Sequence, residues 1–244
     1  MADSLKNHIP NAITCCNLIW GAIASYEAFH AQYSWALTCI IAGAIFDFFD
    51  GFAARLLDVS SAIGKELDSL ADDITFGLAP SAMVFSFMKQ LPACQEGTYM
   101  AWLPYCAFLI AAFSALRLAK FNLDTRQTSS FIGLPTPANA LFWGAFIISM
   151  GSCLQDNPLS AYILLAIILL SSWMMVAEIP MFALKFKNFS WKDNKIRFLF
   201  ALSVLVIIGT GLCLNSIAGI WISMVWYIVL SIATQKKKQF INLH

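Results

Sequence analysis

The chain has 244 residues, of which 59% are hydrophobic and only 12% are charged. A soluble domain carries about 25% charged residues, so the composition excludes an ordinary soluble globular protein. The formal net charge is +1 and no basic stripe with interleaved aromatic residues occurs, so nucleic-acid binding is not indicated. The 7 cysteines form no CxxC pair, which gives no sign of a zinc site or a disulfide framework.

The apolar residues fall into long blocks, each near the roughly 20 residues that a helix needs to cross a bilayer. We predict an all-α polytopic membrane protein with about eight transmembrane helices. The predicted spans are residues 11–30, 33–54, 68–89, 100–120, 134–154, 158–182, 196–214 and 217–234. The opening MADSLKNHIPNA lacks the basic and then apolar form of a cleavable signal peptide, so the first helix is expected to be retained. Without a repeat or linker, we expect one domain over residues 1–244.

The basic residues predict the orientation, because Lys and Arg stay preferentially in cytoplasmic loops. With eight spans, both termini lie on one side of the membrane. Of the 15 Lys and Arg residues, only Lys89 falls on the other side. We therefore expect an integral protein of the cell (inner) membrane, with its termini in the cytoplasm.

Two pairs of aspartates stand at the facing ends of the second and third predicted spans. Asp47 and Asp50 are three residues apart, and Asp68 and Asp72 are four apart. On a helix, both spacings place the two carboxylates on one face. The short connector 56–66 makes the two helices neighbours. We therefore expect the four carboxylates to converge at the cytoplasmic edge of the membrane.

Such an acidic cluster requires compensation, since an Asp at the centre of a membrane helix costs roughly 2.5–3.5 kcal/mol. One interpretation is that the acids cap helices and pair with Arg55 and Lys65, the basic residues nearest in sequence. The other is that they bind two divalent cations, for which oxygen ligands favour Mg²⁺, Mn²⁺ or Ca²⁺ over zinc. Two such ions form a clamp for phosphoryl chemistry. Gly51 and Gly64 would let a phosphate approach the backbone, while Arg55 and Ser61 offer donors to it.

The pattern Asp47-x2-Asp50-Gly51-x2-Ala54-Arg55-x8-Gly64-x3-Asp68-x3-Asp72 resembles the signature of the CDP-alcohol phosphotransferase family. In that family an alcohol attacks the phosphorus of a CDP-linked substrate, and CMP leaves. The resemblance implies a first cation held by Asp47, Asp50 and Asp68. It implies a second cation held by Asp47, Asp68 and Asp72, with Asp72 as the catalytic base. It also implies contacts to the CDP-lipid from Asn11, Thr14, Asn17, Gly51, Ala54, Arg55, Ser61 and Gly64. For Thr14 and Asn17 the alternative is helix capping or interhelical hydrogen bonding.

Three further stretches resemble the integral-membrane phosphatidylserine synthases of bacteria and archaea within that family. They are residues 64–72 with Phe76-Gly77-x-Ala79-Pro80, residues 117–122, and residues 133–138. The likeness covers about residues 10–140 and implies CDP-diacylglycerol and L-serine as substrates, in a membrane lipid environment. A homodimer is common in the family. Two residues depart from the pattern, since Lys120 stands where Arg is commoner and Asp73 replaces a usually apolar residue.

A site for free serine needs a cation for its carboxylate and an acceptor for its ammonium group. Arg117, Lys120 and Asn122 lie at the cytoplasmic end of the fourth predicted span, and Arg117 and Lys120 share a helix face. We interpret these three residues as a candidate serine site. Ordinary positive-inside anchoring is the alternative for each.

Two other functions fit parts of the pattern. The same reaction on glycerol 3-phosphate or inositol phosphate would need a denser basic cluster for the acceptor's phosphate. A cation transporter would also place acids in membrane helices, but transporters favour sites at the midplane and inverted repeats. The last three predicted spans have no assigned role beyond packing against lipid.

Overall fold

The computed structural model describes residues 2–59, 61–124, 130–182, 191–214 and 216–241. It is built almost entirely from helices. The α-helices are α1 (Ala2–Phe29), α2 (Tyr33–Leu57), α3 (Ala62–Asp72), α4 (Ala79–Gln90), α5 (Leu109–Leu123), α6 (Thr136–Gln155), α7 (Ser160–Val176), α8 (Trp191–Cys213) and α9 (Ala218–Ile241). A π-helical turn, η1 (Asp73–Leu78), joins α3 to α4, and the 3₁₀ segments are η2 (Pro92–Cys94) and η3 (Leu103–Phe108).

The predicted all-α membrane architecture is confirmed. Seven of the eight predicted spans overlap a helix or a run of joined helical segments along most of their length. The sixth, 158–182, is too long, because α7 ends at Val176 and residues 180–182 form the strand β2 (Pro180–Phe182). Among the described residues, four helical stretches are long and apolar enough to cross a membrane: Tyr33–Leu57, Leu103–Leu123, Thr136–Gln155 and Asn194–Cys213. Two further helical stretches, Ser160–Val176 and Ala218–Thr234, are also apolar but shorter.

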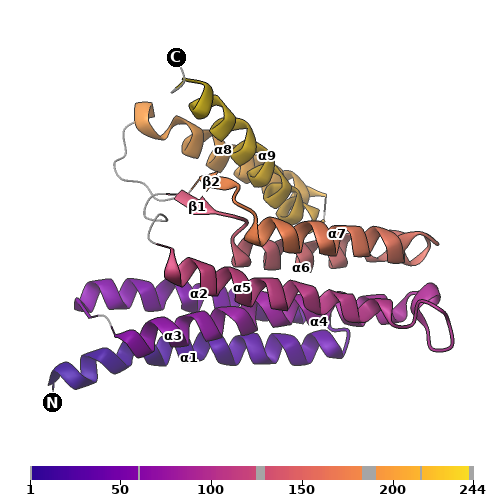
Figure 1. Ribbon diagram of the computed structural model, residues 1–244, viewed down its shortest axis with the longest axis horizontal. Helices are drawn as coiled ribbons and strands as arrows, with labels where there is room; N and C mark the ends of the chain where they lie inside the picture. The colour runs from indigo at the N-terminus through magenta and orange to yellow at the C-terminus, as the bar shows by residue number, and fades with distance from the viewer. Residues whose placement is uncertain (1, 60, 125–129, 183–190, 215, 242–244) are drawn as a thin grey trace.

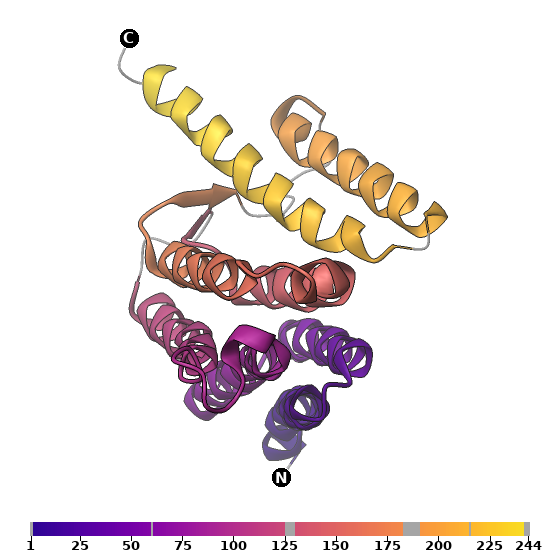
Figure 2. The same ribbon diagram turned by 90° about the vertical axis from the view of Figure 1, so that its right-hand side faces the viewer.

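The helices form three groups. Figures 1 and 2 show α1 to α5 packed together on one side, α6 and α7 in the middle, and α8 and α9 crossing the far side obliquely. The start of α1, the end of α2, the start of α3 and the end of α5 all lie at the left end of the molecule in Figure 1. The connection between α2 and α3, the two helices that carry the acidic residues, therefore lies at this end.

A short strand pair, which the sequence patterns did not predict, ties the middle of the chain to its last third. Strand β1 (Ser130–Ile132) pairs antiparallel with β2 (Pro180–Phe182). Beside it, Gly133 has a positive φ of 79° and its nitrogen donates to the carbonyl of Ile179 at 2.9 Å. The pair holds the start of α6 close to the segment that leads toward α8.

Two apolar clusters hold the helices together. One contains small residues of α1 and α2, such as Ala24, Ala28 and Ala36, packed with residues of η1, α4 and α6. Small side chains let helix backbones approach closely, which favours tight packing of membrane helices. The larger cluster joins α4 to α7 around Trp143, whose indole nitrogen donates to Ser171 Oγ at 3.2 Å. The acidic residues lie next to the apolar cluster of α1, α2, η1, α4 and α6, whose tight packing holds the acid-bearing helices in place.

Candidate active site

The four predicted aspartates converge, as their spacing indicated. Asp47 and Asp50 lie in the second half of α2, and Asp68 and Asp72 lie in the second half of α3. One carboxylate oxygen from each of Asp47, Asp50 and Asp68 lies within 4.8 Å of the others. The Asp47 carboxyl is also within hydrogen-bonding reach of the carboxyls of Asp68 and Asp72. The cluster therefore brings carboxylate oxygens of α2 and α3 close together, and its four residues offer only oxygen ligands.

A tight reversal between α2 and α3 creates this convergence. Asp58 ends α2 with a left-handed φ of 51°, and its nitrogen hydrogen-bonds to the carbonyls of Ala54 and Arg55. Aspartate tolerates this conformation better than most residues. Ser61 then caps α3, because its hydroxyl accepts a hydrogen bond from the Gly64 nitrogen at 2.9 Å. The reversal places the second half of α2, with Asp47 and Asp50, beside the second half of α3, with Asp68 and Asp72.

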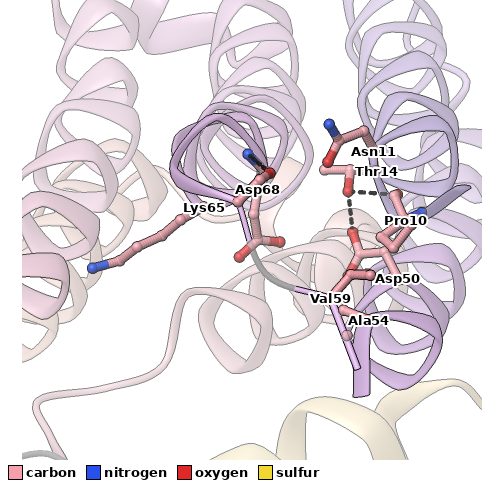
Figure 3. A pocket seen from close by; sticks show the side chains of 11 residues that line it. Pro10, Asn11, Thr14, Asp50, Ala54, Val59, Lys65 and Asp68 are labelled. Atoms are coloured by element: carbon pink, nitrogen blue, oxygen red, sulfur yellow. Dashed lines mark hydrogen bonds between the residues drawn. The ribbon is translucent and has the colours of Figure 1, made fainter. Parts of the chain in front are cut away.

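Helix α1 supplies a polar wall for the cluster. The Thr14 hydroxyl donates to Asp50 Oδ2 at 2.6 Å and lies 3.0 Å from the Pro10 carbonyl (Figure 3). Because a hydroxyl carries one proton, the shorter contact to the carboxylate dominates. Asn17 lies deeper and its Nδ2 donates to Asp72 Oδ1 at 3.4 Å. Both side chains are buried and both contact a predicted metal ligand.

The two nearby basic residues do not neutralise the cluster. Lys65 extends away from Asp50 in Figure 3, and its ammonium donates to the carbonyl of Asn122 at 3.0 Å. Arg55 is exposed, and its Nη1 lies beside Gly51, 3.5 Å from where a Cβ would stand. Within the described ranges, none of the four aspartates takes part in a salt bridge. The alternative of surface ion pairing with Arg55 and Lys65 is therefore not observed.

Carboxylate oxygens without basic partners are suitable ligands for hard divalent cations. Mg²⁺, Mn²⁺ and Ca²⁺ bind such oxygen sets, whereas zinc sites are usually built from His and Cys. The donor set of Asp47, Asp50, Asp68 and Asp72 therefore fits divalent cations of the Mg²⁺ type.

A small cavity of about 210 Å³ opens between α1 and the α2–α3 reversal (Figure 3). It is lined by Pro10, Asn11, Thr14, Asp50, Gly51, Ala54, Val59, Ser61, Gly64, Lys65 and Asp68. Six of the eight residues predicted to contact the CDP-lipid are among them. Arg55 lies outside the lining at the exposed edge, and Asn17 is buried beneath it. Gly64 allows a close approach between α3 and α1 at the cavity wall, since a Cβ there would stand 2.8 Å from Asn11 Oδ1.

A large cavity of about 700 Å³ lies on the other side of the acids. Its lining is mostly apolar and comes from α2, α3, α5, α6, β2, α8 and α9, with Asp68 and Asp72 at one end. Asp68 lines both cavities. The acidic cluster thus stands at the junction of the two spaces. This lining also gives α8 and α9 a role beyond packing against lipid, which the sequence did not reveal.

Two of the three predicted serine-site residues line the large cavity. Arg117 is only 7% exposed, lies with its guanidinium carbon 5.8 Å from the Phe121 ring centroid, and has an Nε with no hydrogen-bond partner. Asp72 lies within electrostatic range of this guanidinium. A buried donor without a hydrogen-bond partner is costly, so the free Nε favours an acceptor such as a carboxylate ligand. Asn122 donates to Ser69 Oγ at 2.8 Å and ties α5 to α3. Lys120 is exposed and does not line the large cavity; together with Arg117 it lines a neighbouring cavity of about 50 Å³.

Several residues of the large cavity were not found from the sequence. Tyr227 of α9 lies within electrostatic range of Arg117, and its hydroxyl donates to the Phe182 carbonyl at 3.0 Å. Thr136, at the start of α6, is fully buried and its hydroxyl has no hydrogen-bond partner. These residues come from distant parts of the chain and follow no local spacing. The only signal in the sequence is Tyr227 itself, a residue with a polar hydroxyl inside an otherwise apolar segment.

The sequence profile of the CDP-alcohol phosphatidyltransferase family matches residues 7–184. The chain belongs to this family, whose members use divalent cations. The matched region contains α1 to β2, including the whole acidic cluster, whereas α8 and α9 lie beyond it. The family signature therefore accounts for the small cavity but not for the far wall of the large one.

Similar proteins carry one name. The chain is 36% identical over 155 residues to the CDP-diacylglycerol–serine O-phosphatidyltransferase of Bacillus subtilis, covering 60% of this chain and 83% of that protein. It is 35% identical over 134 residues to the protein of that name from Helicobacter pylori strain 26695, covering 54% of each. The archaeal protein of that name from Methanocaldococcus jannaschii is 30% identical over 163 residues, which is 67% of this chain and 71% of that protein. The chain thus spans about half the length of the Helicobacter relative.

Proposed function

We propose that this protein transfers the phosphatidyl group from CDP-diacylglycerol to L-serine, which forms phosphatidylserine and CMP. One observation carries the proposal: the acidic cluster stands at the junction of a small cavity and a large apolar cavity that holds the buried Arg117. This arrangement brings a nucleotide, a lipid and a small charged acceptor to the same carboxylates. The names of the similar bacterial and archaeal proteins support the same reaction.

The acids are assigned to metal binding. Asp47, Asp50 and Asp68 would hold one divalent cation, and Asp47, Asp68 and Asp72 a second. Cations bound there supply positive charge for the phosphate oxygens and make a bound hydroxyl more acidic. Thr14 holds Asp50 in place through its 2.6 Å hydrogen bond, which fixes one ligand before substrate arrives. The assignment is supported by the oxygen-only donor set.

The small cavity is assigned to the CDP group. Its wall combines Gly51 and Gly64, which leave the backbone accessible, with the side chains of Asn11 and Ser61. Arg55 lies at the edge beside Gly51 and offers a planar pair of donors to a phosphate oxygen. The acyl chains are assigned to the apolar side, since the large cavity is lined mainly by aliphatic and aromatic side chains.

The chemical step is assigned to Asp72, which lines the large cavity. Its carboxylate takes the proton of the serine hydroxyl, and the serine oxygen attacks the phosphorus that bears diacylglycerol. The new phosphorus–oxygen bond forms as the bond to the CMP oxygen breaks, and CMP leaves with that electron pair. Arg117 holds the serine carboxylate, so the hydroxyl is presented to Asp72.

An acceptor that carries its own phosphate fits this cavity less well. Among the residues that the structure describes, Arg117 is the only Lys or Arg in the lining of the large cavity. A phosphorylated acceptor would bring at least one more negative charge than serine and would need further cations. A cation path is also disfavoured, because the sequence contains no inverted repeat of the kind on which transporters are built.

We further propose that residues 1–244 form a single catalytic domain in the cell's inner membrane. The acidic end would face the cytoplasm, where the basic residues concentrate. Cysteine labelling of intact cells at a residue near the acidic end and at one near Lys89 tests the orientation. A homodimer is the expected assembly, which the mass of the detergent-solubilised protein tests.

The deciding experiment measures CMP release by the purified protein from CDP-diacylglycerol. L-Serine should support rapid release, and glycerol 3-phosphate and inositol phosphate should not. Asp72→Asn, measured in parallel, shows that release depends on this site. If a phosphorylated alcohol supported CMP release and serine did not, the assignment of serine as the acceptor would be wrong. No release with any alcohol, from protein that still binds CDP-diacylglycerol, would overturn the proposal.

A further inference from the structure

Thr75 occupies a buried position immediately behind the acidic cluster. It lies in the π-helical turn η1, three residues after Asp72, and is completely buried. Its hydroxyl lies 2.8 Å from Asn17 Oδ1 and 3.1 Å from the Asn17 backbone carbonyl. π-helical turns occur frequently at functional sites, because the extra residue in the turn re-aims the side chains. Neither the family signature nor the predicted site includes Thr75.

The Asn17 amide links Thr75 to Asp72. Its oxygen faces the Thr75 hydroxyl, and its Nδ2 faces Asp72 Oδ1 at 3.4 Å. With the amide reversed, two acceptors would meet, the Asn17 oxygen and the Asp72 carboxylate. The Thr75 proton therefore stabilises the one orientation in which Asn17 donates to Asp72. Asn17 is fully buried, so water cannot take over this role.

Two glycines make room for this contact. A Cβ at Gly21 of α1 would lie 2.8 Å from the Thr75 Cα. A Cβ at Gly43 of α2 would lie 2.6 Å from the Thr75 methyl and 2.9 Å from Asn17 Oδ1. No side chain can be added at either position without displacing Thr75 or Asn17. The glycines thus form a slot that holds Thr75 against α1 and α2, and Thr75 in turn holds the Asn17 amide.

We propose that Thr75 is a positioning residue that acts through the Asn17 amide to hold the Asp72 carboxylate toward the large cavity. The proposal rests on the assignment of Asp72 as the base in the proposed function. It also reassigns Asn17, which the sequence placed in contact with the CDP-lipid and which the structure places outside the small cavity. Thr75 itself contacts no substrate, so its effect should fall on turnover and not on binding.

A matched pair of variants tests the hydroxyl. Thr75→Val replaces the hydroxyl with a methyl group of similar size, and Thr75→Ser keeps the hydroxyl and removes the methyl group. In Thr75→Val the Asn17 amide loses the donor that fixes its orientation and can turn away from Asp72, so kcat for serine-dependent CMP release should fall about tenfold. The KM values for serine and CDP-diacylglycerol should change less than about threefold. Thr75→Ser should recover most of the wild-type kcat.

A double-mutant cycle with Asn17→Ala separates positioning from packing. If Thr75 acts through Asn17, then Thr75→Val should lower kcat little further once Asn17 is replaced. Thermal unfolding in detergent reports whether each variant is folded, and Thr75→Ala replaces Thr75→Val if the latter is not. Wild-type kcat in Thr75→Val, an equal loss in Thr75→Ser, or fully additive losses in the cycle would overturn the inference. Absence of serine-dependent release from the wild type would instead remove the proposed function itself.

Discussion

The two sides of the acidic cluster differ in how they are built. The small cavity draws all its lining residues from residues 10–68, and its walls combine glycines and polar side chains with Pro10, Ala54 and Val59. The large cavity draws residues from Phe48 to Tyr227, and its walls are mainly apolar. The first side is a compact local unit with a fixed geometry. The second is assembled by tertiary packing and leaves a larger space.

This difference separates two tasks within one site. A nucleotide diphosphate is the same in every turnover, so a local unit with few degrees of freedom can hold it. In the proposed reaction, the lipid chains and the acceptor need space and a positive charge. Helices α8 and α9 help to enclose the space, and Arg117 of α5 supplies the charge. The family profile ends at residue 184, so Phe200, Val204, Met224 and Tyr227 in the lining of the large cavity lie outside the matched region. The following predictions test this division, from the largest expected effect to the smallest.

Removal of divalent cations should abolish activity, because it disables the cluster that both sides share. Treatment of the purified protein with EDTA should reduce CMP release to background, and added Mg²⁺ or Mn²⁺ should restore it. Isothermal titration of the apo protein with Mn²⁺ provides a readout that is independent of turnover. Full activity after exhaustive chelation would contradict the assignment of the four aspartates.

Replacement of the base should be nearly as severe. Asp72→Asn should lower kcat by roughly 10²–10⁴-fold, the usual contribution of general base catalysis. CDP-diacylglycerol binding should largely persist, since Asp72 lies outside the small cavity. Asp58→Asn is the matched control, because Asp58 is exposed and asparagine also tolerates its left-handed conformation. Similar losses in both variants would show that the effect is general and not specific to Asp72.

The two basic residues of the predicted serine site should behave differently. Arg117→Met should raise the KM for serine about tenfold to a hundredfold, because a charged hydrogen bond contributes roughly 1.5–3 kcal/mol. Lys120→Met should change this KM little, since Lys120 is exposed and does not line the large cavity. Apparent KM values for both substrates provide the measurement. A larger effect at Lys120 than at Arg117 would move the acceptor site to the smaller neighbouring cavity.

Filling the apolar side should have a modest effect on lipid use. Val204→Trp on α8 places a large ring in the lining of the large cavity, and overpacking of this kind costs typically 1–3 kcal/mol. We expect the KM for long-chain CDP-diacylglycerol to rise more than that for a short-chain analogue. Val206→Trp is the control, because Val206 lies on the same helix, is 57% exposed, and is not in the lining. Equal behaviour of the two variants would show that α8 does not contact the lipid.

The sequence alone determined the helical membrane architecture and the acidic cluster, because both depend on short-range patterns. Long apolar blocks specify helices in a bilayer, and aspartates three and four residues apart share a helix face whatever the tertiary structure. The exception within this local region is Asn17. Its position near the signature suggested a substrate contact, but its burial and its contact with Asp72 arise only when α1 packs against η1.

The tertiary structure alone decided the rest of the site. Thr75 meets Asn17 across 58 residues of sequence, and Tyr227 approaches Arg117 from a helix more than a hundred residues further along the chain. Such contacts depend on how helices cross and on which residues leave room for others, as Gly21 and Gly43 do for Thr75. No periodicity along the chain encodes them. In the same way, Arg117 and Lys120 share a helix face in the sequence, yet packing buries the first and leaves the second exposed.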